Sequence, residues 1–318
     1  MKKTLTAIAI TAAAALFADA AAAQETKVVI AISGWTGFAP LTLAREAGLF
    51  KKRGLDVTIK KVPQKDRHLV IASGDVQCAA TTVETWIGWN AAGVATTQIF
   101  QLDKSYGADG MVVKPGIAKI ADLKGKTVAA DAPGTSTYFT LSWMLKKNGL
   151  SIKDVKVVNL SPQAAANAML AGNTDIDAAM TYEPYLSAVR AKPEAGKILA
   201  TTLDYPMVMD TFGCTPKFLA ENPKAAKALA DGYFDALEMI KADPKKSFEI
   251  MGADVKSTGE QFEASQKYLR WQDRAANEKF FSGEHAQFSK EAGDLLLETG
   301  IVKQLPDMSK LVDTRFLK

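Results

Sequence analysis

The sequence predicts an α/β fold of two lobes, each a mostly parallel sheet flanked by helices, joined by a two-strand hinge. Short apolar segments typical of buried strands alternate with helical segments in two series, one up to residue 102 and one from residue 127. Beyond Pro216 the chain becomes rich in Ala, Lys and Glu and reads as helices without a convincing strand. The 318 residues suffice for two cores of medium size.

The first residues have the features of a cleaved secretory signal peptide. Lys2 and Lys3 precede an apolar run at 5–17, and small residues then lead to an A-x-A exit at Ala23. The apolar run is too short to cross a membrane comfortably, and no later segment looks membrane-spanning. We therefore expect residues 1–23 to be removed on export to the periplasm. Loss of the two lysines and Asp19 lowers the net charge from +4 to +3, too little to indicate nucleic-acid binding.

The first alternating series supplies the start of one lobe. Its expected strands are 28–32, 56–61, 76–80 and 97–102. Its expected helices are 40–47, 66–73 and 83–92. Pro40 stands in a first-turn position that proline tolerates, and a glycine follows each helix directly.

The second series and the C-terminal helices complete the predicted chain path. Its expected strands are 127–130, 155–159, 176–180 and 197–200, with helices at 136–147, 163–170 and 183–191. Two more strands, 111–113 and 206–214, are expected before and after it. Four further helices are expected at 223–241, 244–251, 259–269 and 277–299. The strands near Met111 and Met209 bracket the series, so we expect them to cross between lobes as a hinge. This places lobe 1 at 24–112 plus 211–318 and lobe 2 at 113–210.

Four loops at predicted carboxyl ends of strands are candidates for a ligand site, because open parallel sheets bind ligands there. They are 33–36, 81–84, 134–138 and 181–185. Thr135 and Ser136 open a helix whose first backbone N–H groups lack internal partners, which favours an anion or a polar acceptor. The alternative is that these hydroxyl residues only cap helices.

Aromatic and acidic residues near these loops suggest what the ligand could be. Trp35, Tyr138 and Tyr182 could line a small-molecule cleft, or pack in a core or lobe interface. Glu84 and Glu183 stand at helix starts, where they either serve as caps or favour a cationic nitrogen in the ligand. Asp210, just inside a returning strand, could join them or stabilise the hinge.

No catalytic or metal-binding pattern is evident. Neither His68 nor His285 has a cysteine or carboxylate at metal-ligand spacing, and no G-x-S-x-G motif occurs. We expect no enzyme, no metal and no cofactor. Export permits a disulfide between Cys78 and Cys214 if their strands are neighbours, but two buried free thiols are the interpretation we favour.

Five short motifs carry a resemblance to a known family by their order and spacing. They are AREAGLFKKRGL at 44–55, SGDV at 73–76, IADLKGK at 120–126, AGNTD at 171–175 and YEPY at 182–185. On these motifs the chain resembles the periplasmic substrate-binding proteins of ABC importers, specifically the nitrate/sulfonate/taurine group. The fold of that group also serves fungal thiamin-pyrimidine synthases. The resemblance covers essentially the whole chain after the signal peptide.

The resemblance implies a type II periplasmic binding protein whose lobes close on a ligand. Its contacts are implied at Trp35, Thr36, Thr82, Glu84, Thr135, Ser136, Tyr138, Tyr182 and Glu183. Asp210 matches an acidic residue of taurine-type members. Sulfonate-binding members oppose the ligand with donors and neutral side chains, and the two glutamates depart from that pattern. The synthases carry a histidine and a cysteine-rich motif that this chain lacks.

We therefore expect a monomeric periplasmic protein that delivers a small polar solute to an inner-membrane ABC permease. A zwitterion such as an aminosulfonate, or a nitrogenous heterocycle, fits the acidic residues better than nitrate or an alkanesulfonate. Two alternatives stay open. The chain could be an exported enzyme, or a sensor partner that presents its ligand to a receptor, acting on a thiamin-precursor-like heterocycle.

Overall fold

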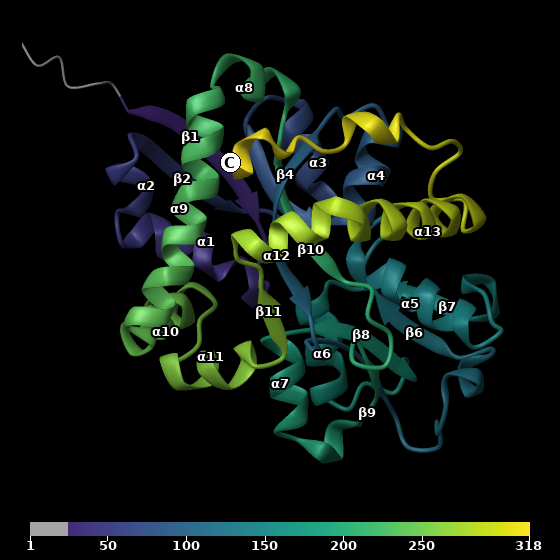
Figure 1. The fold of residues 1–318 in the computed structure, drawn as a ribbon. Coiled ribbons are helices and arrows are strands. Elements are labelled where there is room, and N and C mark those ends of the chain that lie inside the picture. Colours follow the sequence, from purple (N-terminus) through teal and green to yellow (C-terminus); the bar gives the residue numbers. More distant parts are fainter. Residues whose placement is uncertain (1–24) are drawn as a thin grey trace, which may run out of the picture.

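The computed structural model describes residues 25–318 and confirms a two-lobe α/β fold (Figure 1). The expected signal peptide lies outside the described residues. Each lobe contains one sheet, and the two strand orders are β11-β4-β10-β3-β1-β2 and β7-β6-β8-β5-β9. Among the described residues, no helix is both long enough and apolar enough to cross a membrane.

The six-stranded sheet forms the larger lobe. Its strands are β1 (Thr26–Ile32), β2 (Leu55–Lys61), β3 (Cys78–Thr82), β4 (Thr97–Ser105), β10 (Met209–Cys214) and β11 (Leu269–Trp271). β1 runs parallel to β2 and β3, whereas β10 lies antiparallel between β3 and β4. The carboxyl ends of β1, β2 and β3 therefore meet at one edge, next to the start of β10.

The expectation of no strand beyond Pro216 was wrong. β11 is a three-residue edge strand that pairs antiparallel with β4. Three residues are too few to show a periodic pattern. Its pairing partner also lies more than 160 residues earlier in the chain, so only the tertiary fold brings the two strands together.

The five-stranded sheet forms the smaller lobe. Its strands are β5 (Asp109–Val113), β6 (Thr127–Ala130), β7 (Lys156–Asn159), β8 (Ala178–Tyr182) and β9 (Lys197–Thr201). β6 runs parallel to β7 and β8, and β5 lies antiparallel between β8 and β9. The chain enters this sheet between β4 and β5 and leaves it between β9 and β10. The lobe limits of 24–112, 113–210 and 211–318 remain a prediction.

The helices flank the two sheets. The larger lobe includes α1 (Ala39–Glu46), α2 (Leu49–Lys52), α3 (Gln64–Ala72), α4 (Val83–Ala91), α8 (Pro216–Glu221), α9 (Pro223–Ala242), α10 (Pro244–Asp254) and α11 (Gly259–Gln266). The smaller lobe includes α5 (Ser136–Lys147), α6 (Pro162–Leu170) and α7 (Tyr185–Arg190). The single helix expected at 277–299 is instead α12 (Arg274–Lys279), a π-helical segment (Phe280–Glu284) and α13 (His285–Glu298).

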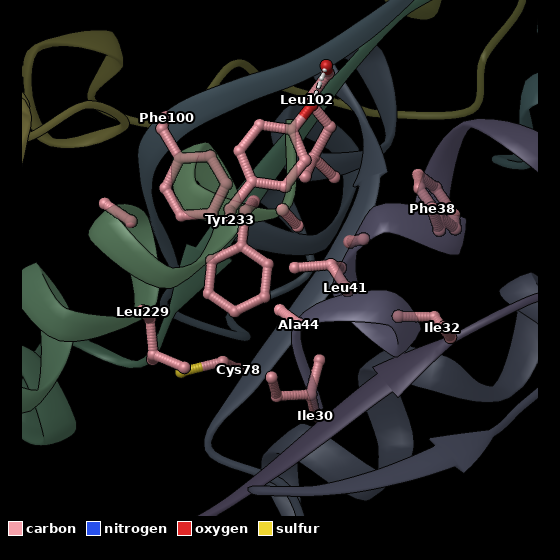
Figure 2. Close-up of a cluster of buried hydrophobic side chains, with 14 of the residues drawn as sticks. Ile30, Ile32, Phe38, Leu41, Ala44, Cys78, Phe100, Leu102, Leu229 and Tyr233 are labelled. Carbon is pink, nitrogen blue, oxygen red and sulfur yellow. Dashed lines mark hydrogen bonds between the residues drawn. The ribbon is translucent and has the colours of Figure 1, made fainter. Parts of the chain in front are cut away.

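An aromatic stack anchors the core of the larger lobe (Figure 2). The Phe100 ring stacks on Phe212 at 4.9 Å and on Tyr233 at 5.2 Å between ring centroids. The Tyr233 hydroxyl donates to the carbonyl oxygen of Leu102, so its polar end is satisfied inside the core. Each fully buried ring of this size contributes about 1.5–3 kcal/mol. Helix α9 is therefore held firmly on β4 and β10, the strands that lead into and out of the smaller lobe.

Cys78 and Cys214 form a disulfide, so the preference for free thiols was wrong. The two residues are opposed in the antiparallel pairing of β3 with β10, and their Cα atoms are 3.9 Å apart. The bond closes a loop with a sequence separation of 136 residues. Sequence could not decide the pairing, because the register of β10 against β3 is a tertiary feature.

Helix α13 forms an additional link between the lobes. In Figure 1 it lies between α4 and α5, and it contacts both helices. Phe139 of α5 and Phe288 of α13 belong to one buried cluster with Val83 and Ile87 of α4. Helix α13 therefore packs beside the start of α5.

Candidate functional site

A small polar cavity lies where the two lobes meet. Its volume is about 20 Å³, which leaves room for little more than one water molecule. It is lined by Ser33, Trp35, Phe38, Gln64, Arg67, Thr81, Thr82, Asp109, Ser136, Tyr182, Val208 and Asp210. Asp109, Ser136 and Tyr182 come from elements of the smaller lobe, so the cavity is closed only when the lobes are together. A solute of several heavy atoms enters only after they separate.

Five of the ten predicted contact residues line this cavity. They are Trp35, Thr82, Ser136, Tyr182 and Asp210. The buried Glu84 and Thr36 lie close by in the sequence but do not line it. Neither Thr135 nor Tyr138 lines it.

Trp35 and Tyr182 meet across the two lobes. Trp35 follows β1 at the start of a short 3-10 turn, and Tyr182 ends β8. Their rings pack edge to face with centroids 5.3 Å apart. The Trp35 indole Nε1 donates to Asp103 Oδ1 at 3.1 Å, which fixes the ring orientation. This aromatic pair closes one side of the cavity and links it to a buried carboxyl group.

Carboxyl groups gather on the β4–β10 side of the cavity. Asp210 and Asp103 are direct partners in the pairing of β10 with β4. Burial, together with the charges of Asp103, Asp109 and Glu84, raises the pKa of Asp210 well above its usual value. Burial also raises the pKa of Asp103, although the Trp35 hydrogen bond opposes this. A proton held by Asp210 would be donated to Asp103.

Glu84 and Asp109 extend this acidic cluster. Burial raises the pKa of Glu84 to about 8, opposed by a hydrogen bond from Thr82. Burial and the charge of Glu183 raise the pKa of Asp109 to about 7, opposed by Ser105. Among the described residues, one oxygen each of Glu84, Asp103 and Asp109 is buried without a hydrogen-bond partner. Leaving such an acceptor unmet costs about 1–3 kcal/mol, so the cluster is short of donors.

Arg67 is the cationic side chain lining the cavity. It lies on α3, is fully buried, and donates to the backbone carbonyls of Val62 and Ala80. Burial lowers its pKa to about 10, against the charges of Tyr182, Asp210 and Asp131. These three hydrogen bonds tie Arg67 to the loop after β2 and to β3, and its positive charge acts on Asp210, which lines the same cavity.

Gln64 connects the lobes at the opposite wall of the cavity. Its Nε2 donates to the hydroxyls of Thr81 and Thr85 at 2.9 and 3.0 Å. Its Oε1 accepts from the backbone N–H and the hydroxyl of Ser136 at 3.2 and 3.0 Å. One side chain of the larger lobe thus satisfies the start of α5 in the smaller lobe.

Glu183 lies away from the cavity. Its carboxylate forms an ion pair with Arg190 and accepts from the backbone N–H of Ser187 at 3.1 Å. Arg190 also donates to the carbonyl oxygen of Gly107 at 2.7 Å and lies over the Tyr268 ring. These contacts satisfy Glu183 and brace the segment that joins β4 to β5.

Sequence reasoning missed Gln64, Arg67, Asp103 and Asp109. Gln64 and Arg67 follow β2, the remaining parallel strand of the larger lobe, so the rule that selected four loops also applied to this one. Asp103 and Asp109 flank the crossing between β4 and β5 and carry no local motif.

His285 is not part of this site. It is buried, its Nε2 lies 3.1 Å from Gln98 Oε1, and burial lowers its pKa to about 4. Among residues 25–318, no group of three or more His, Cys, Asp or Glu is placed to hold a metal ion.

Comparison with known proteins gives consistent matches. A family model described as NMT1/THI5 like matches residues 35–247. The taurine-binding periplasmic protein of Escherichia coli is 30% identical over 243 residues, which cover 73% of this chain and 72% of that protein. A putative binding protein of Brucella abortus is 25% identical over 235 residues, covering 71% and 70%.

Solved structures share the fold at lower identity. The alkanesulfonate-binding protein of Xanthomonas axonopodis, bound to MOPS, superposes with a TM-score of 0.79 at 18% identity, covering 92% of this chain and 100% of that one. A desulfurization enzyme superposes with a TM-score of 0.65 at 14% identity, covering 92% and 98%. The same two-lobe architecture therefore occurs in binding proteins and in an enzyme.

Proposed function

The chain belongs to the NMT1/THI5-like family, and on that basis we propose that it is the periplasmic solute-binding component of an ABC importer. Its relatives include a taurine-binding periplasmic protein, and its fold is shared with an alkanesulfonate-binding protein. In this role the separated lobes would admit a small polar solute, close around it, and deliver it to an inner-membrane permease.

We further propose that the solute carries a basic nitrogen. The observation that carries this is a cluster of four buried carboxyl groups: Asp109 and Asp210 line the cavity, and the charges of Asp103 and Glu84 act on Asp210. Glu84, Asp103 and Asp109 each have one oxygen without a donor. An ammonium or amidinium group supplies several N–H donors and a positive charge at once. Trp35 and Tyr182 would enclose the apolar part of the solute, since aromatic side chains supply a large apolar area. An aminosulfonate is one zwitterionic example.

Solute binding by this cluster would release protons. Buried carboxyl groups with raised pKa values hold protons near neutral pH, and a bound cation favours their ionised forms. A neutral or anionic solute would lack this coupling. The coupling therefore distinguishes a basic solute from nitrate or a simple sulfonate.

Isothermal titration of the mature protein tests this proposal. Taurine, an alkanesulfonate and a set of small amines would be titrated at pH 7 in two buffers with different ionisation enthalpies. We expect an amine-containing solute to bind with proton release. Tight binding of an alkanesulfonate with no binding of any amine would contradict the proposal.

An exported enzyme and a sensor partner are the alternative functions. The similarity in fold to a desulfurization enzyme is the observation that keeps the enzyme open. Incubation of the protein with a metabolite mixture, thiamin-precursor heterocycles included, would reveal an enzyme by product formation. Capture of a permease by the solute-loaded protein would favour the importer over a sensor.

A further inference from the structure

The start of helix α5 is satisfied by a residue from the other lobe. Thr135 precedes this 12-residue helix but does not cap it with its side chain, because its hydroxyl donates to the carbonyl of Ala132 at 2.8 Å. The Oε1 atom of Gln64 takes the acceptor position instead, at 3.2 Å from the backbone nitrogen of Ser136 and 3.0 Å from its hydroxyl. Gln64 lies at the start of α3, beside the loop that follows β2.

The orientation of the Gln64 amide follows from its partners. A backbone N–H can only donate, so the oxygen and not the nitrogen of the amide faces Ser136. The nitrogen then points to the hydroxyls of Thr81 and Thr85 at 2.9 and 3.0 Å, and both hydroxyls can accept. Each polar atom of the amide is therefore used twice, which holds the side chain in one position.

This arrangement puts a neutral oxygen where an oxyanion would otherwise bind. The first N–H groups of a helix, together with its dipole, favour an anionic oxygen. A sulfonate or carboxylate at Ser136 would have to displace the amide oxygen or face it at close range. It would also lie in the same cavity as Asp109 and Asp210, where three of the five N–H groups of Arg67 are already bonded to the backbone carbonyls of Val62 and Ala80.

We infer that Gln64 is a specificity-determining residue. Its amide oxygen already accepts hydrogen bonds at the start of helix α5, so the helix needs no anionic group from the solute. An anionic group in the solute would be repelled by that oxygen. The inference rests on the proposed function and narrows its solute class from any basic nitrogen compound to a small organic cation without an anionic end. A zwitterionic aminosulfonate is then a poor solute for this chain.

Three probes of matched size test the inference: ethylamine (a cation), taurine (a zwitterion) and ethanesulfonate (an anion). Affinities are measured by titration calorimetry at pH 7 for the wild-type protein and the variants Gln64→Ala and Gln64→Glu. We expect the wild type to bind ethylamine at least tenfold more tightly than taurine, in keeping with one hydrogen bond to a charged group. Gln64→Ala frees the donors of Ser136, so the preference should shift toward taurine by roughly tenfold.

Gln64→Glu keeps an acceptor at Ser136 and adds a negative charge. We expect it to retain ethylamine binding and to lose taurine binding further. Gln287→Ala is the matched control, because Gln287 is exposed on helix α13 and lines neither the cavity nor the pocket next to Gln64, so the ratio of affinities should be unchanged. Thermal unfolding of each variant checks that it is folded.

The outcomes separate the two proposals. A wild-type preference for taurine over ethylamine, or an unchanged ratio in Gln64→Ala, would overturn the role of Gln64 and leave the basic-nitrogen proposal intact. Binding of ethanesulfonate alone by the wild type would contradict both.

Discussion

The amide oxygen of Gln64 accepts two hydrogen bonds from Ser136, at 3.2 Å from the backbone nitrogen and 3.0 Å from the hydroxyl. The two residues are 72 positions apart in the sequence and belong to different lobes. Their contact ties the edge of the larger lobe to the start of helix α5. It makes the closed arrangement partly independent of a solute.

Removal of this contact should therefore open the protein. In Gln64→Ala both hydrogen bonds are lost, at about 1 kcal/mol each, and the balance between closed and open lobes shifts toward open. Small-angle X-ray scattering of the solute-free protein should show a larger radius of gyration than for wild type. Gln287→Ala, at an exposed position on helix α13, is the control, and an equal increase in that variant would contradict a specific role for the Gln64–Ser136 contact.

Asp210→Asn should weaken binding of an amine solute with little loss of stability. The asparagine amide can still donate to Asp103, its partner across β10 and β4, but it cannot carry a negative charge. Loss of one charge-assisted hydrogen bond predicts a roughly tenfold to hundredfold weaker affinity by calorimetry. Asp56→Asn, at an exposed position on β2, is the control. Unchanged affinity in Asp210→Asn would exclude contact with the basic nitrogen.

The solute-free protein should become less stable as the pH rises from about 4 to about 8. Burial raises the pKa of Asp109 in the folded state to about 7 from its ordinary value of 3.8, so the folded state binds more protons in this window. Its contribution, about 2–4 kcal/mol, is complete below the unfolded pKa and is lost as pH rises through the folded pKa.

Asp109→Asn removes one of the titrating groups that produce this slope. Urea unfolding at pH 5 and pH 8 should show a smaller difference in the free energy of unfolding for the variant than for wild type. A slope that is the same in both proteins would show that Asp109 is not protonated in the fold. Glu84, with a pKa raised to about 8, would account for part of what remains.

Gly37→Ala should disturb the site through Asp103. A Cβ atom at Gly37 would lie 2.2 Å from Asp103 Oδ2 and 2.2 Å from Trp35 Nε1, so both groups would have to move. We expect a loss of solute affinity of at least tenfold together with reduced thermal stability. Gly88→Ala is the matched control, because a Cβ atom there meets nothing within 4 Å, and alanine favours its helix. Wild-type affinity in Gly37→Ala would contradict this close approach.

Paired substitution of Cys78 and Cys214 by alanine should destabilise the larger lobe. The disulfide closes a loop with a sequence separation of 136 residues, and loss of such a bond costs about 2–5 kcal/mol. The bond lies in the core of the larger lobe, so the affinity for solute should be unchanged under conditions in which the variant is fully folded. Denaturant unfolding under oxidising and reducing conditions measures the effect. Equal stability of wild type in both conditions, with the bond shown to be reduced in one, would contradict it.

Part of the candidate site could be predicted from local patterns. Trp35, Thr82 and Ser136 were found because each stands where a strand ends and a helix begins, and the rule for open sheets applies to such positions. Glu183 occupies an equivalent position, but its carboxylate turns to Arg190, seven residues further along and brought close by helix α7. The sequence shows both residues but cannot rank a ligand against an ion pair.

Other site residues depend on contacts between distant segments. Asp103 reaches the site because β10 inserts between β3 and β4 and sets it opposite Asp210. Gln64 reaches Ser136 only because the lobes close. Such contacts follow from sheet order, register and lobe position, which local residue patterns do not encode.

The sequence by itself determined the class of fold, the alternation of strands and helices, and the loops from which a ligand site could be built. These depend on hydrophobic periodicity, helix ends and turn residues within a few positions of one another. Only the tertiary structure decided the Cys78–Cys214 bond, the edge strand β11, the acidic cluster around Asp210 and the contact of Gln64 with Ser136. Each of these joins segments that are distant in the chain, and their energies depend on burial and register.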